Sequence, residues 1–324
     1  MWEDHPDLMA VLLSRVARGE GLSDEQLEAL KQDASFCATA KALEAVNWNE
    51  ARPLGEQIEL FQRTRRIPPR CLLEVDGRVV QALVEPAELW RFYLPLCRML
   101  RARARDAAGA RFVVGVTGPP GGGKSVFAAM LQRLLTTAEQ SLEPMSVVVG
   151  LDGFHHTNDY LDAHFRSVPG LTPEPLRAIK GAPETFDVQA FVSAMDRFRT
   201  EPELELPAYD RRVHDPVPGA IRVLAAYRLG LVEGNYLLLD EKGWEAVQSR
   251  LDLRIFVSIP LEAIRPHIIE RHMRGGRDAR DAERHFERVD RRNYEVCTAT
   301  MRRADLIVVR GPDQHIKSVR TPKR

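Results

Sequence analysis

The most informative stretch of the chain reads FVVGVTGPPGGGKSVFAAML and covers residues 112–131. It opens with an apolar run typical of a buried β-strand, Phe112 to Val116, and continues from Lys124 with a pattern typical of a helix. Between them, residues 118–125 match G-x-x-x-x-G-K-[ST], which forms a phosphate-binding loop when a strand precedes it and a helix follows. The sequence therefore predicts a nucleotide site built on alternating strands and helices.

Each residue type in this loop has a chemical role in binding a nucleotide phosphate or Mg²⁺. Glycines let backbone N–H groups face a phosphate, and the start of the helix adds positive potential. The ammonium group of Lys124 is expected to reach the β- and γ-phosphates of ATP, and the hydroxyl of Ser125 is expected to bind Mg²⁺. The predicted ATP contacts are Gly118, Pro119, Pro120, Gly121, Gly122, Gly123, Lys124, Ser125 and Val126.

The segments around the loop predict the fold class. After Gly109, strand-sized apolar runs alternate with helical runs, which is typical of a three-layer α/β/α fold with a mainly parallel sheet. Strands are expected at residues 112–116, 147–151, 230–232, 253–258 and 306–309, with helices from 124, 187, 260 and 278 onward. We expect this core to cover residues 111–324.

Two smaller units are predicted before the core. Residues 1–70 read as a helical extension of unknown function, with Ser23 and Gln26 as the cap of its second helix and a proline-rich connector from residue 47. In residues 71–110, Asp76-Gly77 suits the turn of a β-hairpin, and Pro86 opens a helix.

Composition excludes several classes of protein. The 324 residues contain 46 Lys plus Arg and 46 Asp plus Glu, so no overall field favours nucleic acid or an anionic membrane. The four cysteines lie far apart, which argues against a zinc site and a disulfide framework. The acidic first residues do not resemble a secretory signal, so we expect a cytoplasmic protein. The sequence does not determine the oligomeric state, and a homodimer is compatible with it.

Two acids follow predicted strands. Asp152 comes directly after residues 147–151, which we expect to adjoin the strand of the phosphate loop, and Glu233 ends the strand at 230–232. The carboxyl ends of parallel strands are where such sheets place their chemistry, so Asp152 is a candidate base and Glu233 a candidate ligand for Mg²⁺. The alternative interpretation of Asp152 is structural, because Asp-Gly is also a common sequence for a turn after a strand.

Four ordered segments carry a family resemblance: LDGFHHTN (151–158), KGAPETFD (180–187), YDRRVHDP (209–216) and EGNYLLLD (233–240). Over about residues 71–311 the chain resembles the P-loop small-molecule kinases, which include uridine kinase, phosphoribulokinase and bacterial pantothenate kinase. It is most similar to a bacterial nucleoside/nucleotide kinase-like branch of that group. The resemblance implies that Asp152 is the catalytic base.

The resemblance also implies an acceptor site, but it points to more than one acceptor. Tyr209 and His214 match positions where uridine kinases hold the nucleoside base, whereas Asn293 matches an asparagine by which pantothenate kinases touch substrate. Gly181 replaces the ribose-binding aspartate of uridine kinases, and Arg211 replaces a histidine of pantothenate kinases, so a phosphosugar or sugar acid also stays open. The expected substrate residues are His155, His156, Lys180, Glu184, Tyr209, Arg211, His214, Asn235 and Asn293.

A lid is expected at about residues 265–292. The segment around Gly275-Gly276 resembles the kinase lid, in which arginines close over ATP and neutralise the transferred phosphoryl group. Arg271 and Arg277 are the expected catalytic arginines and Arg274 an ATP contact. The alternative interpretation of these arginines is a solvent-exposed helix on which they form ion pairs with acids on neighbouring turns.

Together these observations predict an ATP- and Mg²⁺-dependent kinase that phosphorylates a hydroxyl of a small molecule. A nucleotide kinase of the adenylate type is a second enzymatic possibility, with Arg211 and Arg212 as its phosphate-binding residues. The competing class is a nucleotide-binding regulator that docks a partner through residues 1–70.

Overall fold

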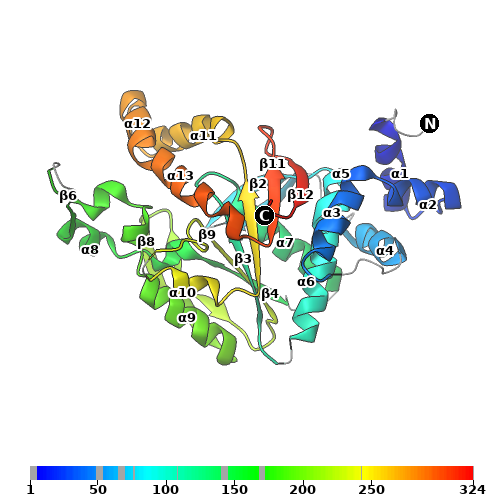
Figure 1. Cartoon of the computed structure of the whole chain (residues 1–324), viewed down its shortest axis with the longest axis horizontal. Helices are drawn as coiled ribbons and strands as arrows, with labels where there is room; N and C mark the ends of the chain where they lie inside the picture. Colours follow the sequence, from blue (N-terminus) through cyan, green and yellow to red (C-terminus); the bar gives the residue numbers. More distant parts are fainter. Residues whose placement is uncertain are drawn as a thin grey trace.

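A computed structural model describes residues 6–48, 54–64, 70–75, 77–107, 109–139, 145–167, 172–241 and 243–323. Its centre is a six-stranded sheet in the order β12-β11-β10-β3-β9-β4 (Figure 1). The strands are β3 (Phe112–Thr117), β4 (Ser146–Gly150), β9 (Leu229–Gly234), β10 (Leu253–Ser258), β11 (Leu306–Arg310) and β12 (Ile316–Arg320). All neighbouring pairs are parallel except β11 and β12, so the predicted α/β fold with a mainly parallel sheet is confirmed.

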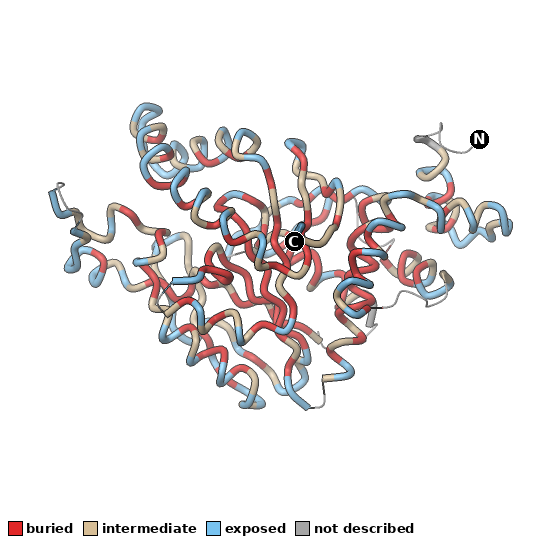
Figure 2. Tube along the Cα trace, in the orientation of Figure 1, coloured by how far each residue is buried: buried red, intermediate tan, exposed pale blue. Residues whose placement is uncertain are grey.

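The alternation of side chains along β3 explains why both faces of the sheet are covered. Val114 and Val116 belong to one hydrophobic cluster, and Val113, directly before Val114, belongs to another. Successive residues of a strand point to opposite faces, so an unbroken apolar strand requires helices on both sides. Figure 2 shows the resulting band of buried residues through the centre of the molecule.

The helices of the N-terminal segment pack into the first of these clusters. They are α1 (Pro6–Arg18), α2 (Asp24–Lys31), α3 (Ala34–Glu44) and α4 (Leu54–Thr64), and they join α6 (Leu94–Asp106) and α7 (Lys124–Glu139) there. Trp90, in the π-helical turn η1 (Leu89–Tyr93), is fully buried, with ring centroids 5.9 Å from Phe36 and 5.8 Å from Phe61. The side chain of Gln57 donates a hydrogen bond to the carbonyl oxygen of Trp90 at 2.9 Å.

The second cluster covers the other face. It combines α9 (Val188–Thr200), α10 (Glu245–Gln248) and α13 (Arg291–Ala299) with the antiparallel pair β7 (Leu204–Asp210) and β8 (Asp215–Val223). The loop after β4 contains η2 (Leu151–Phe154), α8 (Asn158–Ala163), β5 (Phe165–Arg166), β6 (Glu174–Pro175), η3 (Leu176–Ile179) and η4 (Pro183–Thr185). The last short turn is η6 (Met301–Arg303).

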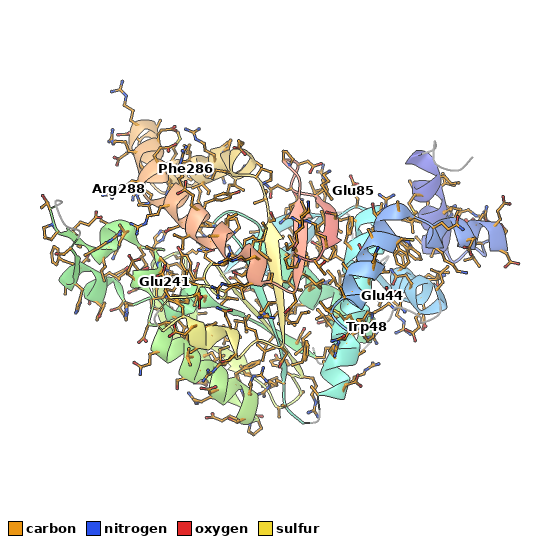
Figure 3. All side chains as sticks on the ribbon, in the orientation of Figure 1. Glu44, Trp48, Glu85, Glu241, Phe286 and Arg288 are labelled. Atoms are coloured by element: carbon orange, nitrogen blue, oxygen red, sulfur yellow. The ribbon has the colours of Figure 1, made fainter. Side chains whose placement is uncertain are left out.

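The predicted lid forms a helical arm at the carboxyl ends of the strands. It consists of α11 (Leu261–Arg274), α12 (Ala279–His285) and the π-helical turn η5 (Phe286–Asp290), around a small apolar cluster that includes Phe286. Arg288, which Figure 3 labels on this arm, forms a 2.8 Å ion pair with Glu174 in the loop after β4.

Several predicted elements are confirmed. The Ser23 cap is present, with a capping box to Gln26. The hairpin consists of β1 (Arg70–Val75) and β2 (Arg78–Leu83), and the helix opened by Pro86 begins as α5 (Pro86–Glu88). Of the predicted turn and connector residues, Asp76, Pro53, Pro68 and Pro69 lie outside the described residues.

One expectation about strand order is wrong. β9 lies between β3 and β4, so the strand that carries Asp152 does not adjoin the strand of the phosphate loop. Sequence patterns did not indicate α3, β12 or the β7–β8 pair, whose apolar patterns are short.

Candidate active site

The phosphate-binding loop joins β3 to α7. Lys124 is buried, and in this structure its Nζ donates a hydrogen bond to the carbonyl oxygen of Pro119, 3.1 Å away in the same loop. Gly123 has a φ of +81° and lies so close to the guanidinium of Arg310 that a Cβ would collide with it. Since only glycine meets both conditions without strain, the loop conformation is encoded at this position.

Arg310 ties the end of β11 to the loop. Its Nε donates to the carbonyl oxygen of Gln314 at 2.7 Å, and its Nη1 lies 3.4 Å from the carbonyl oxygens of Gly122 and Gly123. These bonds use carbonyl groups of the loop and none of its N–H groups. Arg310 was not predicted from the sequence, because nothing near it in the sequence points to the loop.

The two predicted acids lie beside the loop in a cleft of about 430 Å³. Glu233 is buried at the end of β9, where it pairs in register with Val116 of β3 on one side and Gly150 of β4 on the other. Asp152 lies in η2, two residues beyond β4. Ser125, Asp152 and Glu233 line the cleft together, and hydroxyl and carboxylate oxygens are the ligands that Mg²⁺ prefers, so this donor set fits the ion.

Asp152 lies among positive charges. An Nη2 of Arg211 lies 3.4 Å from its Oδ2, and Lys124 and Arg271 are close enough for their charges to act on it. Burial acts to raise the pKa of Asp152, but the opposing charges of His155, Arg211, Lys124 and Arg271 outweigh it and hold the pKa below its usual value. The carboxylate is therefore ionised at neutral pH and able to accept a hydrogen bond from a hydroxyl.

His155 is held beside this carboxylate. Its Nδ1 lies 2.9 Å from the backbone oxygen of Asp152, and its ring packs 3.9 Å from the ring of Phe186. The Nε2 atom of this buried ring has no hydrogen-bond partner among the described residues. Burial lowers the pKa of His155, although the carboxylate of Asp152 acts to raise it.

A basic and aromatic wall faces the acid. The ammonium group of Lys180 lies 5.1 Å from the ring centre of Tyr209, and the guanidinium of Arg211 lies 5.9 Å from it. Lys180 is fixed by 2.7 Å hydrogen bonds to the side-chain oxygen of Asn158 and the backbone oxygen of His214. Burial raises the pKa of Tyr209 to about 12, so its hydroxyl stays protonated.

The structure brings most of the predicted site residues into this one cleft. Its lining includes Pro120, Gly121, Gly123, Lys124, Ser125, Val126, Asp152, His155, Lys180, Tyr209, Arg211, Glu233, Asn235, Arg271 and Asn293. Gly118, Pro119 and Gly122 belong to the same loop without lining the cleft. The side chain of Asn293 is buried and lies 3.3 Å from the backbone oxygen of Gly181.

Other predicted residues lie outside the cleft. Glu184 pairs with Arg166 at 3.7 Å, and the ring of His156 stacks on Tyr160. His214 has a φ of +54° and contributes its backbone oxygen, bonded to Lys180, rather than its ring.

Two of the three predicted lid arginines do not line the cleft either. Arg274 pairs with Glu270 at 2.6 Å and Arg277 with Asp281 at 3.8 Å, each on the outer surface of the arm. Arg271 alone of the three lines the cleft.

The sequence analysis missed two groups of cleft residues. Val75, Arg78 and Val80 reach the cleft from the β1–β2 hairpin, and Arg78 donates a 3.2 Å hydrogen bond to the backbone oxygen of Arg211. The Asp-Gly turn predicted the hairpin but not the surface on which it packs. His272, His285 and Asp290 reach the cleft from the lid.

A second cavity, of about 490 Å³, approaches the acids from the other side. It lies between the β1–β2 hairpin and the β7–β8 pair and shares Ser125, Asp152 and Glu233 with the first. Asp152 therefore stands where the two spaces meet.

Comparison with known proteins agrees with this geometry. The profile of the Phosphoribulokinase / Uridine kinase family matches residues 113–317, which include the phosphate loop, both acids and the lid. The chain belongs to this family. The resemblance to the P-loop small-molecule kinases seen in the sequence is thereby confirmed.

Individual relatives agree with the assignment. The uncharacterized protein YggC of Escherichia coli is 38% identical over 237 residues, which cover 73% of this chain and 93% of YggC. A protein of Schizosaccharomyces pombe named "Putative uridine kinase C227.14" is 32% identical over 56% of this chain and 74% of its own length. Among solved structures, a "putative fructose transport system kinase" from Silicibacter sp. is 28% identical with a TM-score of 0.55, covering 64% of this chain and 93% of that one. Within the described ranges, no helix has the length and apolar character needed to cross a membrane.

Proposed function

We propose that this family member transfers the γ-phosphoryl group of ATP to a hydroxyl of a small molecule, with Mg²⁺. The observation that carries the proposal is the position of Asp152. Its ionised carboxylate shares one cleft with Lys124 and Ser125 of the phosphate loop and faces the wall formed by Lys180, Tyr209 and Arg211. A regulator that only binds nucleotide has no need of a carboxylate at this point.

The mechanism follows from the charges around the loop. Loop N–H groups and Lys124 hold the phosphates of ATP, and Ser125 and Glu233 are the residues that would hold Mg²⁺, which would supply positive charge to offset that of the phosphates. The acceptor hydroxyl donates a hydrogen bond to Asp152, and its oxygen forms a bond to the γ-phosphorus as the bond from phosphorus to the β,γ-bridging oxygen breaks. The hydroxyl proton passes to Asp152, and Arg271 neutralises charge on the equatorial oxygens.

His155 is proposed to bind the acceptor. Its unpartnered Nε2 lines the same cleft as the carboxylate, and a buried polar atom without a partner costs about 1–3 kcal/mol. An acceptor hydroxyl would satisfy this atom. The family name, the Schizosaccharomyces pombe relative and the Silicibacter structure carry names of nucleoside or sugar kinases, and these names support an acceptor that carries several hydroxyl groups.

The test is acceptor-dependent consumption of ATP with Mg²⁺, using nucleosides, nucleoside monophosphates, pantothenate, ketoses and sugar acids. Asp152→Asn removes the base and keeps the shape, so turnover with the active acceptor should fall by about 10²- to 10⁴-fold while ATP still binds. Lys124→Ala should instead weaken ATP binding by roughly 10- to 100-fold, because a charge-assisted hydrogen bond contributes about 1.5–3 kcal/mol. Lys317→Ala, at an exposed position paired with Asp313, is the matched control.

The outcomes separate the proposal from its alternatives. Acceptor-dependent turnover that survives Asp152→Asn would remove Asp152 from the role of base. Tight ATP binding without turnover on the whole panel would favour a regulator, for which the helices of residues 6–64 would be the place to seek a partner.

A further inference from the structure

A second group of reactive side chains lines the lid side of the cleft. It comprises His272, His285 and Asp290, whose ligating atoms all lie within 4.8 Å of one another. Within the described ranges it is the one group of at least three His, Cys, Asp or Glu side chains gathered in this way. The kinase mechanism uses none of the three.

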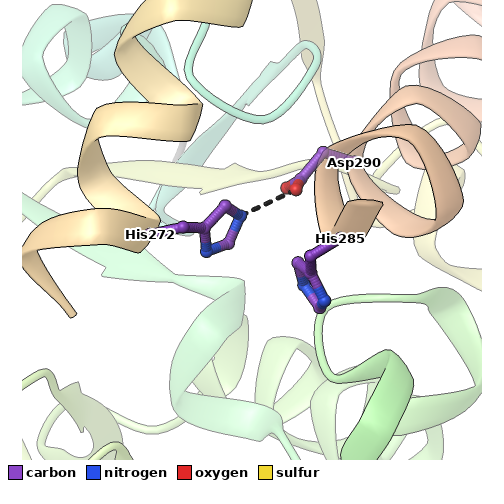
Figure 4. A group of neighbouring side chains, drawn as sticks. All are labelled: His272, His285 and Asp290. Atoms are coloured by element: carbon purple, nitrogen blue, oxygen red, sulfur yellow. Dashed lines mark hydrogen bonds and ion pairs between the residues drawn. The ribbon is translucent and has the colours of Figure 1, made fainter. Parts of the chain in front are cut away.

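The group is formed by tertiary packing. His272 comes from the last turn of α11, whereas His285 and Asp290 are the last residues of α12 and η5. The Nε2 of His272 lies 2.7 Å from the Oδ2 of Asp290, and the rings of His272 and His285 meet edge to face with centroids 4.7 Å apart (Figure 4). Asp290 is buried, and the side chain of His272 is 18% exposed.

We propose that His272, His285 and Asp290 bind one transition-metal dication of the zinc type, with a fourth position open to the cleft. Two imidazoles and one carboxylate are a common ligand set for such ions, and three protein ligands leave room for a water or a bound molecule. Ligands about 2.0–2.2 Å from a tetrahedral zinc ion lie about 3.4 Å from one another. The 2.7 Å spacing between His272 and Asp290 is shorter than that value, and every spacing in the group is below 4.8 Å, so rotations of the side chains can bring the atoms into place.

The surrounding charges determine which ions suit the site. Arg277 and Arg288 lie near His285, and Arg271 lies near Asp290, so positive charge opposes any cation. An ion held mainly by charge, such as Mg²⁺, is therefore disfavoured, whereas an ion that forms strong bonds to imidazole can overcome the repulsion. The site is thus distinct from the oxygen ligands proposed for Mg²⁺, which come from the phosphate loop and β9.

An ion at this site would bridge the two halves of the lid. His272 precedes the turn at Gly275-Gly276, and the other two ligands follow it. The ligand His272 is also the direct neighbour of Arg271, the lid arginine that lines the cleft. Metal binding would consequently fix the arm and hold Arg271 at one distance from Asp152.

The experiment uses the full chain without an affinity tag. Co²⁺ serves as a spectroscopic probe, because a tetrahedral site gives visible absorption that aqueous Co²⁺ lacks, and Zn²⁺ is followed by calorimetry and by displacement of Co²⁺. The variants are His272→Gln, His285→Gln and Asp290→Asn, which keep side-chain size. His267→Ala, an exposed histidine of the same helix, and Asp152→Asn, an acid of the same cleft, are the matched controls.

We expect one ion per chain in the wild type and in both controls, with affinity at least about tenfold weaker in each of the three ligand variants. Zinc should raise the melting temperature of the wild type and leave that of the ligand variants unchanged, which separates lost binding from lost folding. Binding that is unaffected in the three variants, or absent from a folded wild type, would overturn the proposal. Neither result bears on the kinase proposal, which is tested without zinc.

Discussion

At the scale of single residues, the chemistry of the cleft depends on how Asp152 keeps its charge. The nearest cation is Arg211, whose guanidinium also lies over the ring of Tyr209. Its neighbour Arg212 points away and forms a 2.5 Å ion pair with Asp210 instead. The two adjacent arginines therefore have different surroundings, so a substitution of Arg212 can serve as the control for the same substitution of Arg211.

This difference predicts a shift in the pH profile. A base with a lowered pKa stays ionised as pH falls through the ordinary carboxyl range, so the acid limb of kcat lies below that range. Arg211→Ala removes a charge that lowers the pKa of Asp152, while the burial that raises it remains, so the limb should move to higher pH. Arg212→Ala should leave the limb where it is. Equal shifts in both variants, measured from kcat against pH, would contradict this assignment.

How far the site was predictable depended on whether its residues share a motif. Lys124 belongs to the motif that follows β3, and Asp152 and His155 belong to the motif that follows β4, so sequence motifs alone indicated that they lie near one another. The position of Arg78 depends on how a hairpin packs, and that of Arg310 on which strand ends beside the loop. Neither is encoded locally.

At the scale of elements, the turn η1 connects the N-terminal helices to the kinase core. Trp90 is buried between α3 and α4, and Asp33 before α3 forms a 2.7 Å ion pair with Arg91. Sequence patterns correctly predicted a helical segment here, including the Ser23 cap of α2. They did not reveal that these helices cover the same sheet face as α7, because that packing depends on long-range contacts.

Trp90→Ala should destabilise the whole protein. Removing a fully buried aromatic side chain from a core costs about 3–5 kcal/mol, because contacts with Phe36 and Phe61 are lost and a cavity stays behind. The free energy of unfolding from urea titration measures this loss. Leu72→Ala, at a side chain that is 69% exposed, should change it by less than about 0.5 kcal/mol. A Trp90 variant as stable as the wild type would mean that this packing contributes little.

At the scale of the whole molecule, the N-terminal helices and the nucleotide-binding sheet share one hydrophobic cluster. Removing residues 1–69 would expose Trp90 and the apolar face of α6 together, at a combined cost comparable with the 5–15 kcal/mol of a typical folded chain. The shortened chain should therefore melt at a much lower temperature than the full chain, or fail to fold. An unchanged melting temperature would show instead that residues 1–69 form an independent unit.

The sheet order also governs the sequence of events during synthesis. β3 leaves the ribosome early, but its two neighbours, β9 and β10, are made more than a hundred residues later, and Arg310 later still. A nascent chain that has reached residue 228 holds the entire phosphate-loop sequence without either strand that supports it. Folding of this centre must wait for distant partners, which slows it and leaves an apolar strand exposed in the meantime. The growing chain can thus bind nucleotide only late in synthesis. Nucleotide binding would indicate that β9 and β10 have paired with β3.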